Sequence, residues 1–228
     1  MGIVDLHLLL QTILYFSTCL IGLITCITFG VSRAIFSGNC LIYASLDWNL
    51  KGDQFTTKYS PSSICDFPIY LFVLGCVLYP LGVGIYNAYA TYKTREDGSI
   101  PFQMWVWPFV LLNAILTFLV LVCSCIISVG MFRVCSELSK GNIYKGCADA
   151  QDQEWTDANG DNFNTGYFFN LLEVAEVACW ICTLVWLVQV VLGVIRIYRN
   201  RRMRSSLEKD ENYDKTKIAK RESKHSKH

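Results

Sequence analysis

The sequence predicts an all-α membrane protein with four transmembrane helices and two disulfide-bearing outer loops. Hydrophobic residues make up 53% of the 228 residues and charged residues only 17%, and the mean hydropathy is positive. This balance suits a lipid-embedded protein better than a water-soluble one. Four mostly apolar stretches are each long enough for a helix to cross roughly 30 Å of hydrocarbon. They cover residues 8–30, 68–89, 104–131 and 171–198.

The segments between these stretches predict the order of the chain. Residues 1–7 contain no Lys or Arg, and no small-residue cleavage pattern follows the first stretch, so we expect that span to be retained and not removed as a signal peptide. Residues 90–103 form a short polar turn that makes the second and third spans a membrane hairpin. The two longer loops are residues 31–67 and 132–170.

The positions of Lys and Arg predict which side of the membrane each end faces, because these residues resist translocation. Twelve of the twenty Lys and Arg follow Ile195, which predicts a cytosolic tail. An even number of spans then places both termini in the cytosol and both longer loops outside the cell or in an organelle lumen. We expect a multi-pass protein of the plasma membrane or of secretory or endosomal membranes.

The tail, residues 199–228, is rich in charge and poor in apolar residues, so the sequence predicts a disordered, basic cytosolic segment. Its arginines stand next to the membrane and are followed by two serines. These arginines either only enforce topology or also bind anionic lipid until phosphorylation of the serines releases the segment. The residues concerned are Arg199, Arg201, Arg202, Arg204, Ser205 and Ser206.

Four of the eleven cysteines lie in the polar loops and are candidates for disulfide bonds. An oxidising lumen would join them, and four cysteines allow three connectivities. We favour Cys40 with Cys65 and Cys135 with Cys147, because each of these bonds closes a loop whose ends neighbouring helices already hold. Free thiols are the alternative.

The other seven cysteines lie inside apolar runs. Cys123 and Cys125 have a spacing that occurs in metal sites, as do Cys179 and Cys182. A thiolate is costly inside an apolar helix, so we interpret these residues as small packing side chains. We expect no metal and no cofactor.

Polar residues within the spans are candidates for function, because they are costly in lipid. Glu173 and Glu176 lie three residues apart, on one face of the fourth span. We expect an ion pair with Arg133, which lies at the matching depth of the third span, and the alternative is an ion or proton path. Asn113 and Gln189 lie deeper, and we expect them to hydrogen-bond to each other and join their helices by about 0.6–2 kcal/mol.

The sequence does not predict an enzyme. The three histidines all lie near the termini, and the chain contains no Ser/His/Asp set, no zinc-protease motif and no Gly-rich phosphate loop. The net charge of +1 gives no indication of nucleic-acid binding.

Two stretches near the ends of predicted spans resemble the transmembrane protein 179 family. They are FSGNCLIY at residues 36–43 and SCIISVGMFRVC at residues 124–135. Further features follow Cys147 in the same order as in that family: an acidic run with Trp155, an aromatic stretch at residues 167–169, and Ala175 and Glu176 followed by Trp180. The resemblance implies a four-span fold with cysteine-bearing outer loops, and it implies no established activity.

Claudins and tetraspanins share the four-span outline, but we expect neither to fit. A claudin-like first loop would carry a Trp-rich element before two closely spaced cysteines, whereas Trp48 lies between Cys40 and Cys65. A tetraspanin-like loop would carry a Cys-Cys-Gly element, which is absent from residues 132–170.

These observations predict a non-catalytic membrane scaffold or auxiliary subunit, whose outer loops and lipid-facing helix faces contact another membrane protein. The alternative is a small ion channel or transporter that uses Glu173 and Glu176. The expected partners are the lipid bilayer, another membrane protein and, at the tail, anionic lipid.

Overall fold

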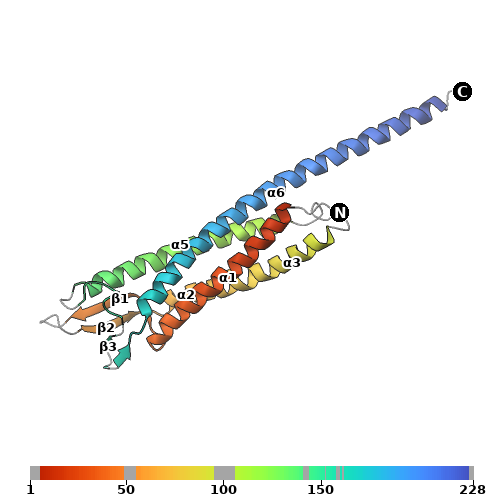
Figure 1. Ribbon diagram of the computed structural model, residues 1–228. Helices are drawn as coiled ribbons and strands as arrows, with labels where there is room; N and C mark the ends of the chain where they lie inside the picture. Colours follow the sequence, from red (N-terminus) through yellow and green to blue (C-terminus); the bar gives the residue numbers. More distant parts are fainter. Residues whose placement is uncertain are drawn as a thin grey trace.

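The computed structural model describes residues 6–48, 55–94, 106–140, 144–151, 153–157, 160 and 162–225. Its helices lie side by side in one elongated bundle (Figure 1). A small sheet covers one end of the bundle, and the last helix extends beyond the other. We call these two ends the sheet end and the tail end.

Four helical rods have the length and the composition of membrane spans. The first is α1 (Leu6–Ile35), the third is α5 (Trp107–Leu138), and the fourth is the part of α6 (Phe168–His225) that ends at Met203. The prediction of a membrane protein with four transmembrane helices is therefore confirmed, and the predicted all-α class holds except for the small sheet described below. The helices extend beyond most of the predicted apolar boundaries, because a helix can continue past the hydrocarbon into the headgroup region.

The second rod is made of three segments that follow one another without a break: α2 (Ser63–Leu71), the π-helix η1 (Phe72–Leu78) and α3 (Tyr79–Lys93). Pro80 explains the π-helix, because proline has no N–H to donate and its ring clashes with the carbonyl four residues earlier. The wider turn lets the N–H of Tyr79 donate to the carbonyl of Leu74, five residues back. Within a membrane, such local adjustments keep the backbone hydrogen-bonded.

The helix α1 lies at the centre of the packing. It contacts α6 on one side and η1 and α3 on another, while α5 packs against α6. Gly22 permits the close approach of α1 to η1, because a Cβ at this position would lie 2.7 Å from the carbonyl oxygen of Cys76. Small residues at helix contacts serve this purpose in membrane proteins.

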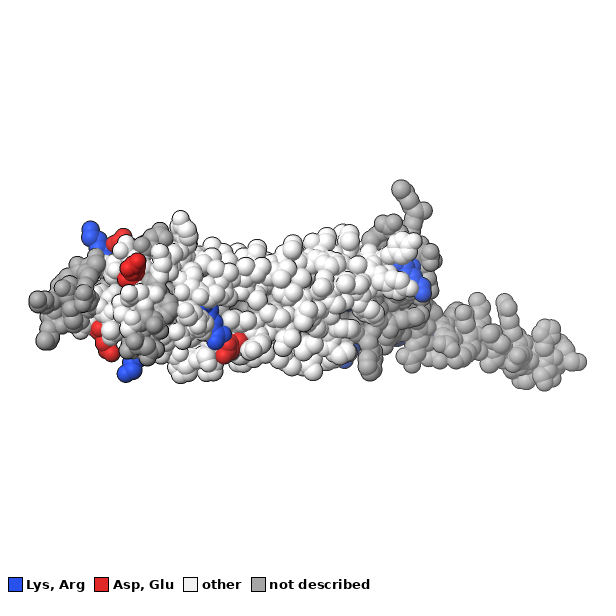
Figure 2. Space-filling view, turned by 90° about the horizontal axis from the view of Figure 1, so that it is seen from below, with Lys and Arg blue, Asp and Glu red and all other residues white. Residues whose placement is uncertain are grey.

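The outer surface of the bundle suits a lipid environment. Figure 2 shows a band without Lys, Arg, Asp or Glu across the middle of the face that it presents. Exposed aromatic side chains lie toward both ends of the rods, as expected at membrane interfaces. They include Tyr70, Phe132 and Tyr167 toward the sheet end and Tyr92, Trp107 and Tyr198 toward the tail end.

The two longer loops come together in one sheet. The first loop supplies β1 (Cys40–Trp48) and β2 (Phe55–Ser60), and the second supplies β3 (Glu154–Asp157) and β4 (Asn162–Asn164). The strand order is β1-β2-β3-β4, antiparallel within each loop and parallel where β2 meets β3. This sheet is not predicted from the sequence, and it adds a minor β element to the helical fold.

An aromatic cluster beneath the sheet joins both loops to the helices. The rings of Phe36, Trp155 and Phe168 lie with centroids 5.2 to 5.8 Å apart in all three pairs. Each of these side chains is almost fully buried. Such pairs contribute about 0.5–1.5 kcal/mol each beyond their burial. The cluster thereby connects the sheet to the region where α1 ends and α6 begins.

Two disulfide bonds, one in each loop, close the sheet end covalently. Cys40 is bonded to Cys65 and Cys135 to Cys147. This is the connectivity that the sequence favours. The first bond joins the start of β1 to the start of α2, and the second joins the end of α5 to the loop before β3.

A bulge in β1 packs directly onto α5. The pairing of β1 with β2 shifts register between Cys40 and Ser45, and Tyr43 has a φ of 63°, which is rare for a bulky residue. Gly130 of α5 lies against this bulge. A Cβ at Gly130 would lie 1.9 Å from Cγ2 of Ile42 and 2.9 Å from Cε2 of Tyr43. The docking of the sheet therefore requires a glycine at this position of α5.

The tail differs from the expectation. The sequence predicts a disordered segment over residues 199–228, whereas α6 continues as a helix to His225 and extends beyond the bundle (Figure 1). Residues 205–225 contain no Gly or Pro, and opposite charges such as Glu211 and Lys215 stand four positions apart, which favours a helix. The expectation of disorder is wrong for this part of the tail, although the composition explains why it does not pack into the bundle.

We predict that Gly130→Ala loosens the sheet from α5. The added methyl group overlaps Ile42, and overpacking of this kind typically costs about 1–3 kcal/mol. Gly30→Ala in α1 is the matched control, because nothing lies within 4 Å of its added Cβ. Thermal unfolding of the purified protein should show a lower Tm for the Gly130 variant alone. Equal Tm values would contradict the packing argument.

Candidate functional site

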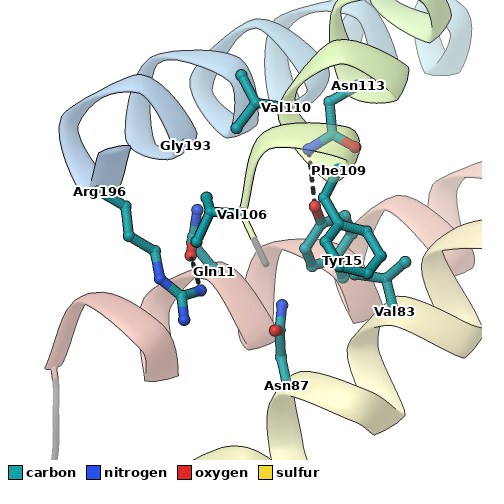
Figure 3. A pocket seen from close by; sticks show the side chains of 10 residues that line it. All are labelled: Gln11, Tyr15, Val83, Asn87, Val106, Phe109, Val110, Asn113, Gly193 and Arg196. Carbon is teal, nitrogen blue, oxygen red and sulfur yellow. Dashed lines mark hydrogen bonds between the residues drawn. The ribbon is translucent and has the colours of Figure 1, made fainter. Parts of the chain in front are cut away.

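Side chains from all four spans enclose a polar cavity in the tail-end half of the bundle (Figure 3). The centre of a water-sized sphere can occupy about 20 Å³ of this cavity. This volume is enough for one water molecule or a small ion. Five polar side chains line it, and none is more than 7% exposed. They are Gln11 and Tyr15 of α1, Asn87 of α3, Asn113 of α5 and Arg196 of α6.

A chain of hydrogen bonds crosses the bundle beside this cavity. The hydroxyl of Tyr79 donates to Oδ1 of Asn113 at 2.9 Å, and Nδ2 of Asn113 donates to the hydroxyl oxygen of Tyr15 at 2.7 Å. These bonds join α3, α5 and α1. Because a buried polar group without a partner is costly, the three side chains hold one another in place.

A second set of bonds joins α6 to α1. Nη1 of Arg196 donates to Oε1 of Gln11 at 3.1 Å, and Nε2 of Gln189 donates to the backbone carbonyl of Gln11 at the same distance. A guanidinium within a membrane bundle is costly to bury unless polar groups receive it. Gln11 is one such group, and it couples the beginning of α1 to the charged part of α6.

The expected pair between Asn113 and Gln189 is not formed, and that prediction is wrong. Both side chains are buried, at 1% and 0% exposure, but Asn113 bonds to Tyr15 and Tyr79 while Gln189 bonds to Gln11. Counting residues along a helix gives the depth of a side chain and not the direction in which it points. The depths agree, but the two side chains meet different groups of α1.

Most of the residues that line the cavity are not among the functional candidates predicted from the sequence. Gln11, Asn87 and Tyr15 carry polar groups within apolar stretches, and this feature of the sequence could have identified them as candidates. In the sequence, Arg196 is one of the twelve Lys and Arg after Ile195 that predict a cytosolic tail. Its 7% exposure distinguishes it from Arg199 and Arg201, which are exposed.

The expected ion pair between Arg133 and the acids of α6 is likewise wrong. Among the residues that the structure describes, Arg133 forms no salt bridge with Glu173 or Glu176. Arg133 and Glu173 are exposed, as long charged side chains near a helix end usually are. Glu176 is half-buried and accepts a hydrogen bond from Oγ of Ser128 at 2.6 Å. Ser128 on α5 thus takes the place expected for the arginine.

Trp180 completes this contact in the sheet-end half of the bundle. Its Nε1 donates to Oγ of Ser128 at 3.0 Å, so one serine joins two side chains of α6 to α5. Glu176 and Trp180 are also residues on which the resemblance to the transmembrane protein 179 family rests. The arrangement gives them a structural role in helix pairing.

The four cysteines with metal-like spacing differ in how deeply they are buried. Cys123, Cys179 and Cys182 are fully buried, whereas Cys125 is exposed. Oγ of Ser124 donates to Sγ of Cys179 at 3.1 Å, so this thiol packs within a polar contact between α5 and α6. Among the described residues, no group of three or more His, Cys, Asp or Glu side chains is arranged to hold a metal ion.

The basic start of the tail lies on the exposed surface of α6. Arg199, Arg201 and Arg202 are exposed, and the guanidinium carbon of Arg201 lies 5.5 Å from the ring centroid of Trp107 at the start of α5. Such a cation–π contact positions the arginine at the level of an interfacial aromatic residue. The side chain of Arg204 lies outside the described part of the chain.

The two predicted phosphorylation sites follow this basic segment. Ser205 and Ser206 are exposed, and the hydroxyl of Ser205 donates to the carbonyl of Arg202 at 2.9 Å. Their exposure is compatible with access by a kinase, and their place on the helix keeps them close to the arginines.

Comparison with known proteins identifies the family. The family model described as "Transmembrane protein 179/179B Claudin domain" matches residues 7–221. A transmembrane protein 179B of Danio rerio is 29% identical over 178 residues, which cover 76% of each chain. No solved structure matches the chain significantly.

The family description corrects one expectation from the sequence. The chain was expected not to fit claudins, because Trp48 lies between Cys40 and Cys65 and not before both cysteines. The position of Trp48 does differ from the claudin pattern. The matching family model is nevertheless described as a claudin domain, and it covers the four spans and both loops. The expectation relied on one short element, whereas the match extends over nearly the whole chain. The chain belongs to the transmembrane protein 179/179B family.

Proposed function

We propose that this protein is a non-catalytic membrane scaffold or auxiliary subunit that binds another membrane protein through its sheet end and its lipid-facing helix faces. The observation that carries the proposal is the construction of the sheet end. Two disulfide bonds, a mixed sheet and a buried aromatic cluster join the described parts of both loops to each other and to the helices. A surface that is already ordered loses less conformational entropy when a partner binds.

The strands present a polar face for such a partner. Side chains alternate along β2 and β3, so that Thr57 and Trp155 are buried while their neighbours are exposed. The exposed side chains on the three longer strands are Ser45, Asp47, Thr56, Lys58, Glu154 and Thr156. This set mixes hydroxyl groups with both signs of charge, which suits specific recognition by hydrogen bonds more than insertion into lipid.

The runner-up function is a small channel or transporter that uses Glu173 and Glu176. Transporters place their polar sites near the membrane midplane. Near the middle of this bundle, Cys123, Cys182 and Trp186 are fully buried and belong to one packed core. Glu176 lies nearer the sheet end, where it is bonded to Ser128. These observations favour the scaffold over a transport path.

The scaffold proposal predicts crosslinks from the sheet end and no transport. A photo-crosslinking residue at Thr56 or Thr156 should yield a discrete adduct with another membrane protein in native membranes. The same residue at Lys93, exposed at the tail end, is the matched control. The purified protein in liposomes should move neither ions nor small solutes. Flux that is lost in Glu176→Gln would instead establish the channel alternative.

For orientation, we propose that the tail end faces the cytosol, as the arginines of α6 suggest. Protease added to sealed, intact cells should then leave a C-terminal tag intact and should cleave it only after the membrane is permeabilised. Cleavage of the tag in intact cells would reverse the assignment of both ends.

We also propose that the start of the tail binds anionic lipid and that phosphorylation releases it. Each basic residue near an anionic surface contributes about 1 kcal/mol, and each phosphate adds nearly two negative charges beside the arginines. A peptide of residues 195–220, phosphorylated at Ser205 and Ser206, should bind phosphatidylserine vesicles about tenfold or more weakly than the unmodified peptide. A peptide with alanine at both serines is the control. Equal affinity of all three peptides would leave the arginines as topology signals only.

A further inference from the structure

We propose that the sheet-end half of α6 is a docking site for a transmembrane helix of the partner protein. Glu176 selects a helix that carries a lysine or an arginine at the matching depth of the membrane. This inference rests on the proposed scaffold function and names the chemistry that the partner must have. It follows from the depth of Glu176, from its hydrogen bonding and from the exposed side chains beside it.

The aromatic residues at the two ends of the fourth span indicate how deep Glu176 lies. Tyr167 and Tyr198 are exposed, and they lie about 46 Å apart along the span at 1.5 Å per residue. A bilayer with its headgroups is about 40–45 Å thick, and roughly 30 Å of this is hydrocarbon. Glu176 lies about 13 Å from Tyr167 by the same count, so its Cα is roughly 5 Å inside the hydrocarbon. A charged side chain at this depth is costly.

The carboxylate of Glu176 is not neutralised within the described part of the chain. No salt bridge is formed there by Glu176, and its hydrogen-bond donor is the hydroxyl of Ser128 at 2.6 Å. One neutral hydroxyl does not replace the water that a carboxylate loses in an apolar medium. Charged groups within membranes are usually paired, so the carboxylate indicates a cation from a second molecule.

The surface around Glu176 is open to such a cation. Its side chain is half-buried, so part of it is accessible from outside the bundle. Trp180 lies one turn along the same side of α6 and is 40% exposed, and its Nε1 donates to the same serine. An ammonium or guanidinium group that reaches this place meets a carboxylate and an exposed indole, which is the side chain that attracts cations most strongly through its ring.

A spanning helix fits this site better than a lipid headgroup does. The amines of phospholipids lie in the headgroup region, whereas Glu176 lies within the hydrocarbon. A lysine or arginine on a partner helix can stand at the same depth, where the low dielectric constant strengthens its attraction to the carboxylate. The exposed side chains of Val177, Leu184 and Leu187 continue from the site along α6. Lipid covers such apolar side chains equally well, so the carboxylate is the feature that selects a partner.

The test measures how synthetic transmembrane helices associate with the full chain in phosphatidylcholine vesicles. One leucine–alanine peptide carries a single lysine about 5 Å inside the hydrocarbon, and the matched peptide carries leucine at that position. Fluorescence energy transfer should show about tenfold tighter association of the lysine peptide. Glu176→Gln should remove this preference, because the amide keeps an oxygen for Ser128 but carries no charge. Glu137→Gln, at the sheet end of α5 where Glu137 already pairs with Lys140, should retain it.

Equal association of the two peptides with the unsubstituted protein would overturn the docking site, since Glu176 would then be protonated and need no cation. A lysine preference that persists in Glu176→Gln would overturn it as well. A Tm of Glu176→Gln no lower than that of the unsubstituted protein shows that lost preference is not lost folding.

The crosslinks from Thr56 and Thr156 test the scaffold function separately. If those crosslinks form while both peptides bind equally, the protein has a partner that Glu176 does not select. If the lysine preference appears without the crosslinks, the docking site on α6 is supported and the role of the sheet end is overturned.

Discussion

In hydrocarbon, every backbone N–H and C=O must find its partner within the protein, and this constraint organises the whole molecule. It makes the four spans helical, and it confines strands and turns to the two ends. It also accounts for η1, where the turn widens beside Pro80 so that the carbonyl of Leu74 still receives a hydrogen bond. The buried amides of Gln11, Asn113 and Gln189 likewise form hydrogen bonds across helices.

How much of this the sequence predicts depends on the range of the interaction. The spans and the disulfide pairing follow from local patterns, because apolar length and the placement of cysteines are read within one segment. The sheet does not, because its central contact pairs Thr56 with Thr156, and no short pattern connects strands so far apart in the chain. The tail helix was missed because composition measures the lack of a core and not the local preference for a helix.

The site was harder to predict than the fold for a related reason. Asn113 and Gln189 were recognised as buried polar groups, but their partners depend on the rotation of each helix about its axis. Arg196 lies in a run of arginines whose charge has an obvious topological explanation, and only its burial shows a further role. The two ends of the bundle therefore differ: strands with exposed polar side chains lie at the sheet end, and buried polar side chains, Arg196 among them, lie in the tail-end half.

The connectivity of the cysteines has a consequence for biogenesis. Neither disulfide crosses from one loop to the other, so the bond in the first loop needs no cysteine that follows Cys65 in the chain. The second loop contains its own pair, and it joins the first through the backbone pairing of β2 with β3, through buried aromatic rings and through a hydrogen bond from Trp48 to the carbonyl of Glu137. Because synthesis proceeds from the N-terminus, both cysteines of the bond in the first loop are made before the last two spans. The four-stranded sheet can form only when the first loop and the second loop lie side by side at the sheet end, because β2 and β3 come from different loops.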